Sequence, residues 1–77
     1  MSRDIAIAAC KAVEGVDVSV GLTGEVTIAK GDRLETLIFP EFLEKQMLFR
    51  LQFHYGVPIH WFWNPTMIPG YKKPRFH

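Results

Sequence analysis

The chain is poor in cysteine and carries almost no net charge. It has one cysteine, Cys10, and its 9 Lys and Arg residues against 8 Asp and Glu residues give a formal charge of +1. A single cysteine excludes an internal disulfide, and no charged leader followed by an apolar run opens the sequence, so we expect an intracellular, cytoplasmic protein. A charge so close to zero selects no class of partner by bulk electrostatics.

Long hydrophobic runs and chemical motifs are lacking as well. The longest stretch without a charge, residues 51–71, contains three prolines and two glycines, which argues against a transmembrane helix and against a membrane as partner. The histidines, at positions 54, 60 and 77, do not have the paired spacing of zinc ligands. No serine, threonine or cysteine lies in a recognisable catalytic motif. We therefore expect neither an enzyme nor a cofactor or metal site.

The length leaves room for one domain, which we expect over residues 1–63, with a Pro-rich basic tail over residues 64–77. The first segment has the spacing of an amphipathic helix that Ser2 or Asp4 can cap and Gly15 can end. Its predicted buried face consists of Ile5, Ala8, Ala9, Ala12 and Val13. These short side chains would let the helix lie close to its neighbour.

Beyond Gly15 the apolar period changes to two, which indicates strands. Residues 16–20 alternate valine with polar residues, and residues 25–30 place Val26 and Ile28 on one face. Gly31 and Asp32 suit a tight hairpin into a third strand over residues 33–39. The predicted sheet is an antiparallel three-stranded meander, and its first two strands form a hairpin.

A second helix is expected from Pro40 to Tyr55, ending at Gly56. Its apolar residues fall into two stripes: a broad one of Leu43, Met47, Leu48, Leu51 and Tyr55, and a narrow one of Phe42, Phe49 and Phe53. A helix that lies on a sheet needs only one apolar face. The narrow stripe is therefore either a ridge that binds a partner, or core that residues 57–71 cover by folding back.

Residues 57–63 alternate again, and Pro58 would confine such a strand to a sheet edge, so we predict an edge strand or extended tail here. Trp61, Phe62 and Trp63 are consecutive, and in an extended segment at least one of these rings faces away from the core. That ring is a candidate for partner binding. The tail beyond residue 63 has three prolines and a glycine and is expected to lack regular structure.

The helix, three strands and helix are similar in order to two known scaffolds, but the motifs differ. Double-stranded RNA-binding domains begin their second helix with a lysine cluster, whereas this one begins with Pro40 and Glu41. Nucleases of the restriction-endonuclease type need a strand Glu-x-Lys to hold Mg²⁺, and the strands contain none. Element order alone does not fix function.

The leading prediction is a small, non-enzymatic protein-interaction module of α+β fold. Adaptors, assembly subunits and compact inhibitors of larger complexes, of the type that phages and mobile elements encode, have this character. Its predicted binding residues are Phe42, Phe49, Phe53, Trp61 and Trp63. The amount of apolar surface also predicts either a homodimer or tight docking of the tail. The alternative is a protein that binds single-stranded nucleic acid through the tryptophans and Tyr71, Lys72, Lys73 and Arg75.

Overall fold

The computed structural model describes residues 3–38 and 45–71, and it confirms the predicted small α+β fold. Helix α1 and helix α2 span Arg3–Lys11 and Lys45–Tyr55, and strands β1, β2 and β3 between them span Asp17–Val20, Val26–Lys30 and Arg33–Leu37. Two short elements follow, α3 over His60–Trp63 and the 3-10 helix η2 over Pro65–Met67. No helix within these two ranges is long and apolar enough to cross a membrane. The predicted beginning of the second helix, at Pro40, lies outside the described residues.

The sheet is the predicted antiparallel meander, in the order β1-β2-β3. Lys30 pairs with Arg33 across a two-residue turn. Gly31, the first residue of that turn, has φ of 56°, while no residue other than glycine has a positive φ in the described chain. A positive φ at the first central position alone is the requirement of a type II′ hairpin. The Gly31-Asp32 dipeptide therefore fixes the register between β2 and β3.

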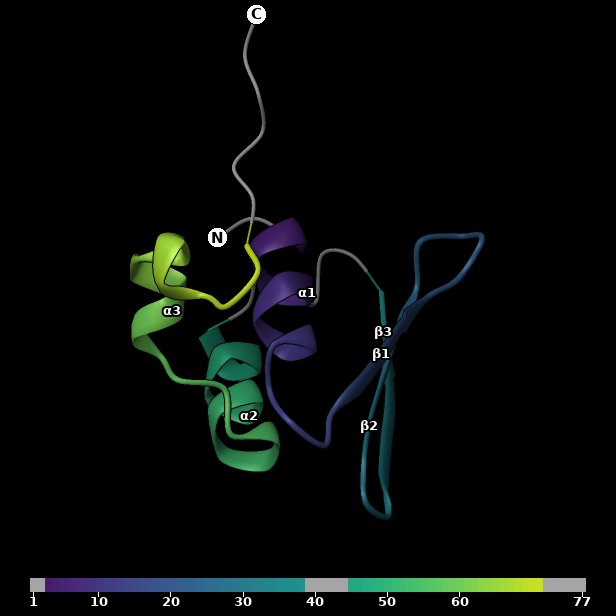
Figure 1. Ribbon diagram of the computed structural model, residues 1–77. Helices are drawn as coiled ribbons and strands as arrows, with labels where there is room; N and C mark the ends of the chain where they lie inside the picture. Colours follow the sequence, from purple (N-terminus) through teal and green to yellow (C-terminus); the bar gives the residue numbers. More distant parts are fainter. Residues whose placement is uncertain (1–2, 39–44, 72–77) are drawn as a thin grey trace, which may run out of the picture.

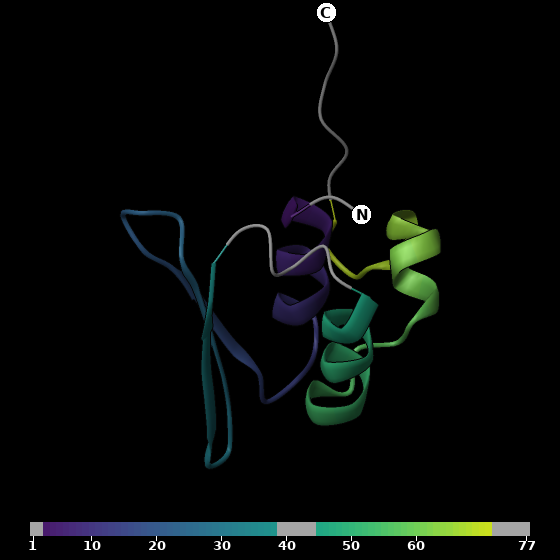
Figure 2. The ribbon, with the colours of Figure 1, turned by 180° about the vertical axis from the view of Figure 1, so that it is seen from behind.

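One face of the sheet is covered, and Figures 1 and 2 show all the helices on that side. Val26 and Ile28 point into the core, as predicted, and Leu37 of β3 joins them. Helix α2 contributes Met47, Leu51 and Tyr55, so the broad stripe of the sequence pattern is its core-facing side. The opposite face carries Thr27 and Thr36, whose hydroxyl groups lie 3.2 Å apart.

Helix α1 is rotated relative to the predicted buried face. Its fully buried residues are Ala6, Ala9 and Cys10, whereas Ala8 is only partly buried. The cause is that α1 packs against β1 on one side and α3 on the other, as its central position in Figure 1 shows. With neighbours on two sides, the helix turns Ala6, Ala9 and Cys10 toward the core. Ile5, Ala12 and Val13 are only partly buried and pack against its margin.

The prediction of an edge strand over residues 57–63 is wrong, because residues 60–63 form helix α3. The backbone N–H groups of Trp61 and Phe62 donate to the carbonyl groups of Pro58 and Ile59 at 3.1 Å, which forms consecutive tight turns. Ile59 and Phe62 contact the core three residues apart, a helical spacing that a short run in which His60 is the only polar residue does not reveal in advance. Pro58 has no backbone N–H to donate to a neighbouring strand, so forming a turn at this residue loses no hydrogen bond from it.

The segment after α3 is more regular than the sequence predicts. Pro65–Met67 forms η2, and Ile68 is almost fully buried in the core. Tyr71 packs partly against the same core. The described part of the predicted tail therefore docks on the domain.

Candidate functional site

The most exposed aromatic side chains of the described chain lie on α2 and α3. Phe49 is 62% exposed and Phe53 is 88% exposed. They are four residues apart on α2, so their rings lie on the same side of the helix, about one turn apart. We call the exposed side of α2 around these two rings the phenylalanine face. It is the candidate functional site.

The opposite side of α2 explains why this face stays open. Leu51 and Tyr55 are fully buried and Met47 is nearly so, which anchors the helix to the sheet through its broad stripe. Residues 57–71 do not cover the narrow stripe: they send Val57, Phe62 and Ile68 into the core instead. Phe49 and Phe53 are therefore exposed, and they are not core covered by residues 57–71. Phe42, the third member of the stripe, lies outside the described residues.

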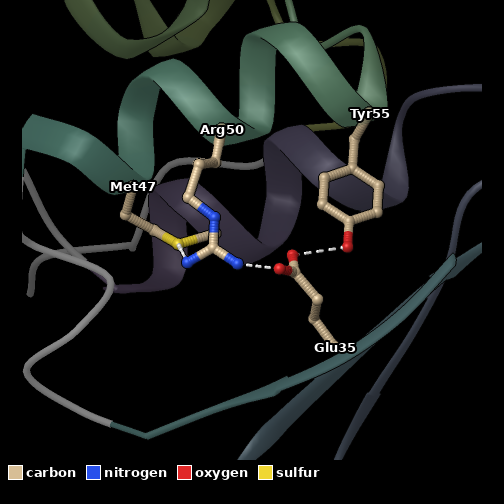
Figure 3. Close-up of polar contacts among 4 residues, drawn as sticks. All are labelled: Glu35, Met47, Arg50 and Tyr55. Carbon is tan, nitrogen blue, oxygen red and sulfur yellow. Dashed lines mark hydrogen bonds and ion pairs between the residues drawn. The ribbon is translucent and has the colours of Figure 1, made fainter.

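Glu35 of β3 forms polar contacts with Arg50 and Tyr55 of α2, as Figure 3 shows. We call these three side chains the polar clamp, because they hold α2 in its orientation. Glu35 lies on the covered face of the sheet, where Tyr55 donates a hydrogen bond of 2.6 Å from its hydroxyl group to Glu35 Oε2. Glu35 also forms an ion pair with Arg50, whose guanidinium group lies 3.9 Å from the sulfur of Met47. Burial raises the pKa of Tyr55, and the charges of Arg33 and Arg50 oppose that shift. The clamp fixes the rotation of α2 about its axis and thereby the direction of the two phenylalanines.

Sequence reasoning did not identify this clamp, although a signal was present. Leu37 is an inward-facing strand residue, so Glu35, two positions earlier, must face inward too. An inward-facing carboxylate needs a cation or a donor to compensate for its lost hydration. Arg50 and Tyr55 lie on the adjoining side of α2 and provide both.

Helix α3 divides its three aromatic residues between the core and solvent. Phe62 is buried, Trp61 is partly buried, and Trp63 is 72% exposed. One of the consecutive rings does face away from the core, as predicted, although a helical turn rather than a strand places it there. Met67 of η2 is also largely exposed. Trp63 is the second candidate for contact with a partner.

The basic tail contributes little to a described site. Tyr71 borders a shallow groove of about 190 Å³ beside Ala8, Lys11 and Ala12 of α1. Its ring is partly buried there, so it is less available for stacking than Trp63. Lys72, Lys73 and Arg75 lie outside the described residues.

Two candidate chemistries of the sequence, metal binding and a cysteine nucleophile, can be compared with the described residues. In residues 3–38 and 45–71, no three His, Cys, Asp or Glu side chains are grouped so that they could hold a metal ion. Cys10 is fully buried, and burial raises the pKa of its thiol to about 12. A thiol with that pKa supplies almost no thiolate near neutral pH and makes a poor nucleophile.

Comparison with family models, curated proteins and solved structures finds no match to this chain.

Proposed function

We propose that this protein is a small, non-enzymatic protein-interaction module that binds its partner through the phenylalanine face of α2, with Trp63 of α3 as an additional anchor. The observation that carries the proposal is the exposure of Phe49 and Phe53 on a helix whose other side is firmly packed. Binding energy at protein interfaces is concentrated in a few large, well-positioned side chains. Two rings on a rigid helix meet that requirement.

The composition of the face supports a protein partner over a nucleic acid. Interface centres are enriched in aromatic residues and depleted of charge, and the Lys, Arg, Asp or Glu residues of α2 are Lys45, at its first position, and Arg50. Arg50 is the one whose side chain is described. Its guanidinium group is paired with Glu35. Binding to a phosphate backbone depends on available cations, and among the described side chains from Gln46 to Gly56 the only Lys or Arg is this paired Arg50. We further propose that the module acts in the cytoplasm, as its single buried cysteine suits, as an adaptor or as an inhibitor of a larger complex.

The test compares proteins captured from an extract of the source cells by three forms of the purified chain. We expect the wild-type protein to retain a specific partner, and the double change Phe49→Ala and Phe53→Ala to lose it. Leu34→Ala is the matched control, because Leu34 is also an exposed apolar residue, at 69%, but lies on β3. All three forms are first compared by circular dichroism to confirm that they are folded.

Three results would count against the proposal. Equal capture by all forms would place the binding surface elsewhere on the molecule. Loss of capture by Leu34→Ala alone would assign it to the sheet. Tight binding of a single-stranded oligonucleotide that weakens steeply with salt, and that is abolished when Lys72, Lys73 and Arg75 are changed to alanine, would favour the nucleic-acid alternative.

A further inference from the structure

The two outer strands of the sheet differ in how their free edges are protected against pairing with another chain. Devices that protect an edge include lysine, proline, a bulge and a charged residue that points inward. Strand β3 has such a charge, because Glu35 lies on the covered face. Strand β1 reads Asp-Val-Ser-Val, pairs with β2 without a bulge and places both valines on the covered face. The edge of β1 is therefore the less protected one.

The edge of β1 presents backbone groups that have no partner in the described chain. The N–H group of Gly21 donates to the carbonyl group of Glu25 of the next strand segment at 2.8 Å. Bonded positions alternate in an antiparallel ladder, so the N–H and C=O groups of Val18 and Val20 point away from β2. Among the described residues no other segment forms a hydrogen bond with these four groups. They are available to an extended backbone from another chain.

The end of β1 is also open on the covered face. Val20 lies opposite the fully buried Val26, yet it is 47% exposed, and Leu22 just beyond the strand is fully exposed. Figures 1 and 2 show that the turn joining β1 to β2 lies away from the helices, which leave this end of the strand uncovered. A strand added along β1 would remove Val20 from water.

Two carboxylates flank β1 on the open face of the sheet. Asp17, the first residue of the strand, is exposed and lies on this face, because it alternates with Val18. At the other end, the carboxylate of Glu25 lies over Gly21, where a side chain of that residue would be, and accepts a hydrogen bond from Thr23. No Lys or Arg within the three described strands lies on this face. The strip of open face beside β1 is therefore acidic at both ends.

We propose that β1 binds an extended peptide segment of another protein as a fourth, antiparallel strand of the sheet. Apolar side chains at two alternate positions of the segment pack beside Val18 and Val20, and a Lys or Arg on either side of them lies beside the two carboxylates. The segment has the pattern basic-apolar-any-apolar-basic. This surface is separate from the phenylalanine face, because it lies on the sheet and not on α2.

The charges favour such a segment over a second copy of this chain. If two β1 strands paired about a two-fold axis with Val18 bonded to Val20, Asp17 of each copy would lie opposite Gly21 of the other. The carboxylate of Glu25 lies over that glycine, so two like charges would meet. Like charges directly opposite each other across paired strands are destabilising. A basic segment replaces this repulsion with attraction.

A titration followed by nuclear magnetic resonance tests the proposal on the full chain. The probe is a capped peptide of sequence lysine-valine-threonine-valine-lysine, for which we expect a dissociation constant of about 0.1–1 mM, since so short a segment makes few contacts. The amide signals of Val18 and Val20 should move to saturation, while those of Leu34 and Thr36, at the edge of β3, stay in place. The same peptide with glutamate for lysine should bind at least about tenfold more weakly.

Three results of the titration would overturn the proposal. The first is a lack of saturable movement at millimolar peptide, and the second is movement of the Leu34 and Thr36 signals instead. The third is movement of the Val18 and Val20 signals when the concentration of the protein alone is raised, which would assign the edge to a second copy.

Two proline variants test which edge is used. Val20→Pro removes an outward N–H group that the sheet does not use, so the fold should tolerate it, and it should raise the dissociation constant of the lysine peptide at least about tenfold. Thr36→Pro makes the matched change at the edge of β3 and should leave binding unchanged. Equal binding by a folded Val20→Pro variant would contradict the proposal.

A charge reversal gives an independent readout that does not depend on the proline variant. The double change Asp17→Lys and Glu25→Lys should reverse the preference, so that the glutamate peptide binds more tightly than the lysine peptide. An unchanged preference would contradict the proposed charge pattern. Phe49→Ala with Phe53→Ala should leave peptide binding intact, so the phenylalanine face and the edge of β1 can fail separately.

Discussion

Alanine substitutions on the two sides of α2 should have different effects on the stability of the protein. Leu51 is fully buried, and changing it to alanine should lower the free energy of unfolding by about 2–5 kcal/mol. Phe53 is 88% exposed, so folding removes only about 25 Å² of its ring from water, worth roughly 0.6 kcal/mol. The better helix propensity of alanine returns about 0.5 kcal/mol. Phe53→Ala should therefore leave stability almost unchanged.

Urea unfolding followed by circular dichroism measures both changes, at low protein concentration so that self-association adds nothing to stability. A domain of this length has a total stability of about 4–12 kcal/mol, so Leu51→Ala should shift the midpoint far to lower urea and can unfold the protein outright. Equal destabilisation by Phe53→Ala and Leu51→Ala would refute this expectation. That result would mean that the phenylalanine ring packs in the core.

Three further predictions concern the clamp and the buried thiol. Tyr55→Phe should lower the free energy of unfolding by about 1.5–3 kcal/mol, because it removes a hydrogen bond to a charged group. A double-mutant cycle with Glu35→Gln should show that the two changes are coupled, and additive effects would refute the hydrogen bond. The pKa of Tyr55 is raised in the folded protein, so its contribution to stability is fully present below its unfolded pKa of about 10 and is lost as the pH rises beyond that value. Above that pH the urea midpoint of the wild type should fall, and that of Tyr55→Phe should fall less. An equal fall in both proteins would contradict this prediction. Cys10 should react with a thiol reagent slowly in the native protein and rapidly in denaturant, and equal rates would place it at the surface.

The sheet could be predicted because its signals are local. Alternating valines and the Gly31-Asp32 turn determine strand, face and register within a few residues of one another. The two stripes of α2 were predictable for the same reason: an 11-residue helix displays its periodicity fully, and the broad stripe with Leu51 and Tyr55 is its buried side.

The parts that could not be predicted depend on tertiary packing. Residues 60–63 are too few for a period of two to be told from a helical turn, because only His60 among them is polar. The contacts of Ile59 and Phe62 with the core decide between the two structures. The rotation of α1 depends on α3, which lies on the far side of it from β1. The pairing of Glu35 with Arg50 joins residues 15 positions apart, and the strand pattern alone indicates only that the carboxylate faces inward.

The central claim is that the phenylalanine face of α2 contacts another protein chain. The most direct measurement places the photo-crosslinking analogue benzoylphenylalanine at position 53, irradiates the protein in an extract of its source cells and identifies the adducts by mass spectrometry. The analogue at position 34, on the exposed face of β3, is the control. We predict a discrete adduct from position 53 that position 34 does not give, containing peptides of one partner protein or of a second copy of this chain. The same diffuse adducts from both positions, or none from position 53, would contradict the claim.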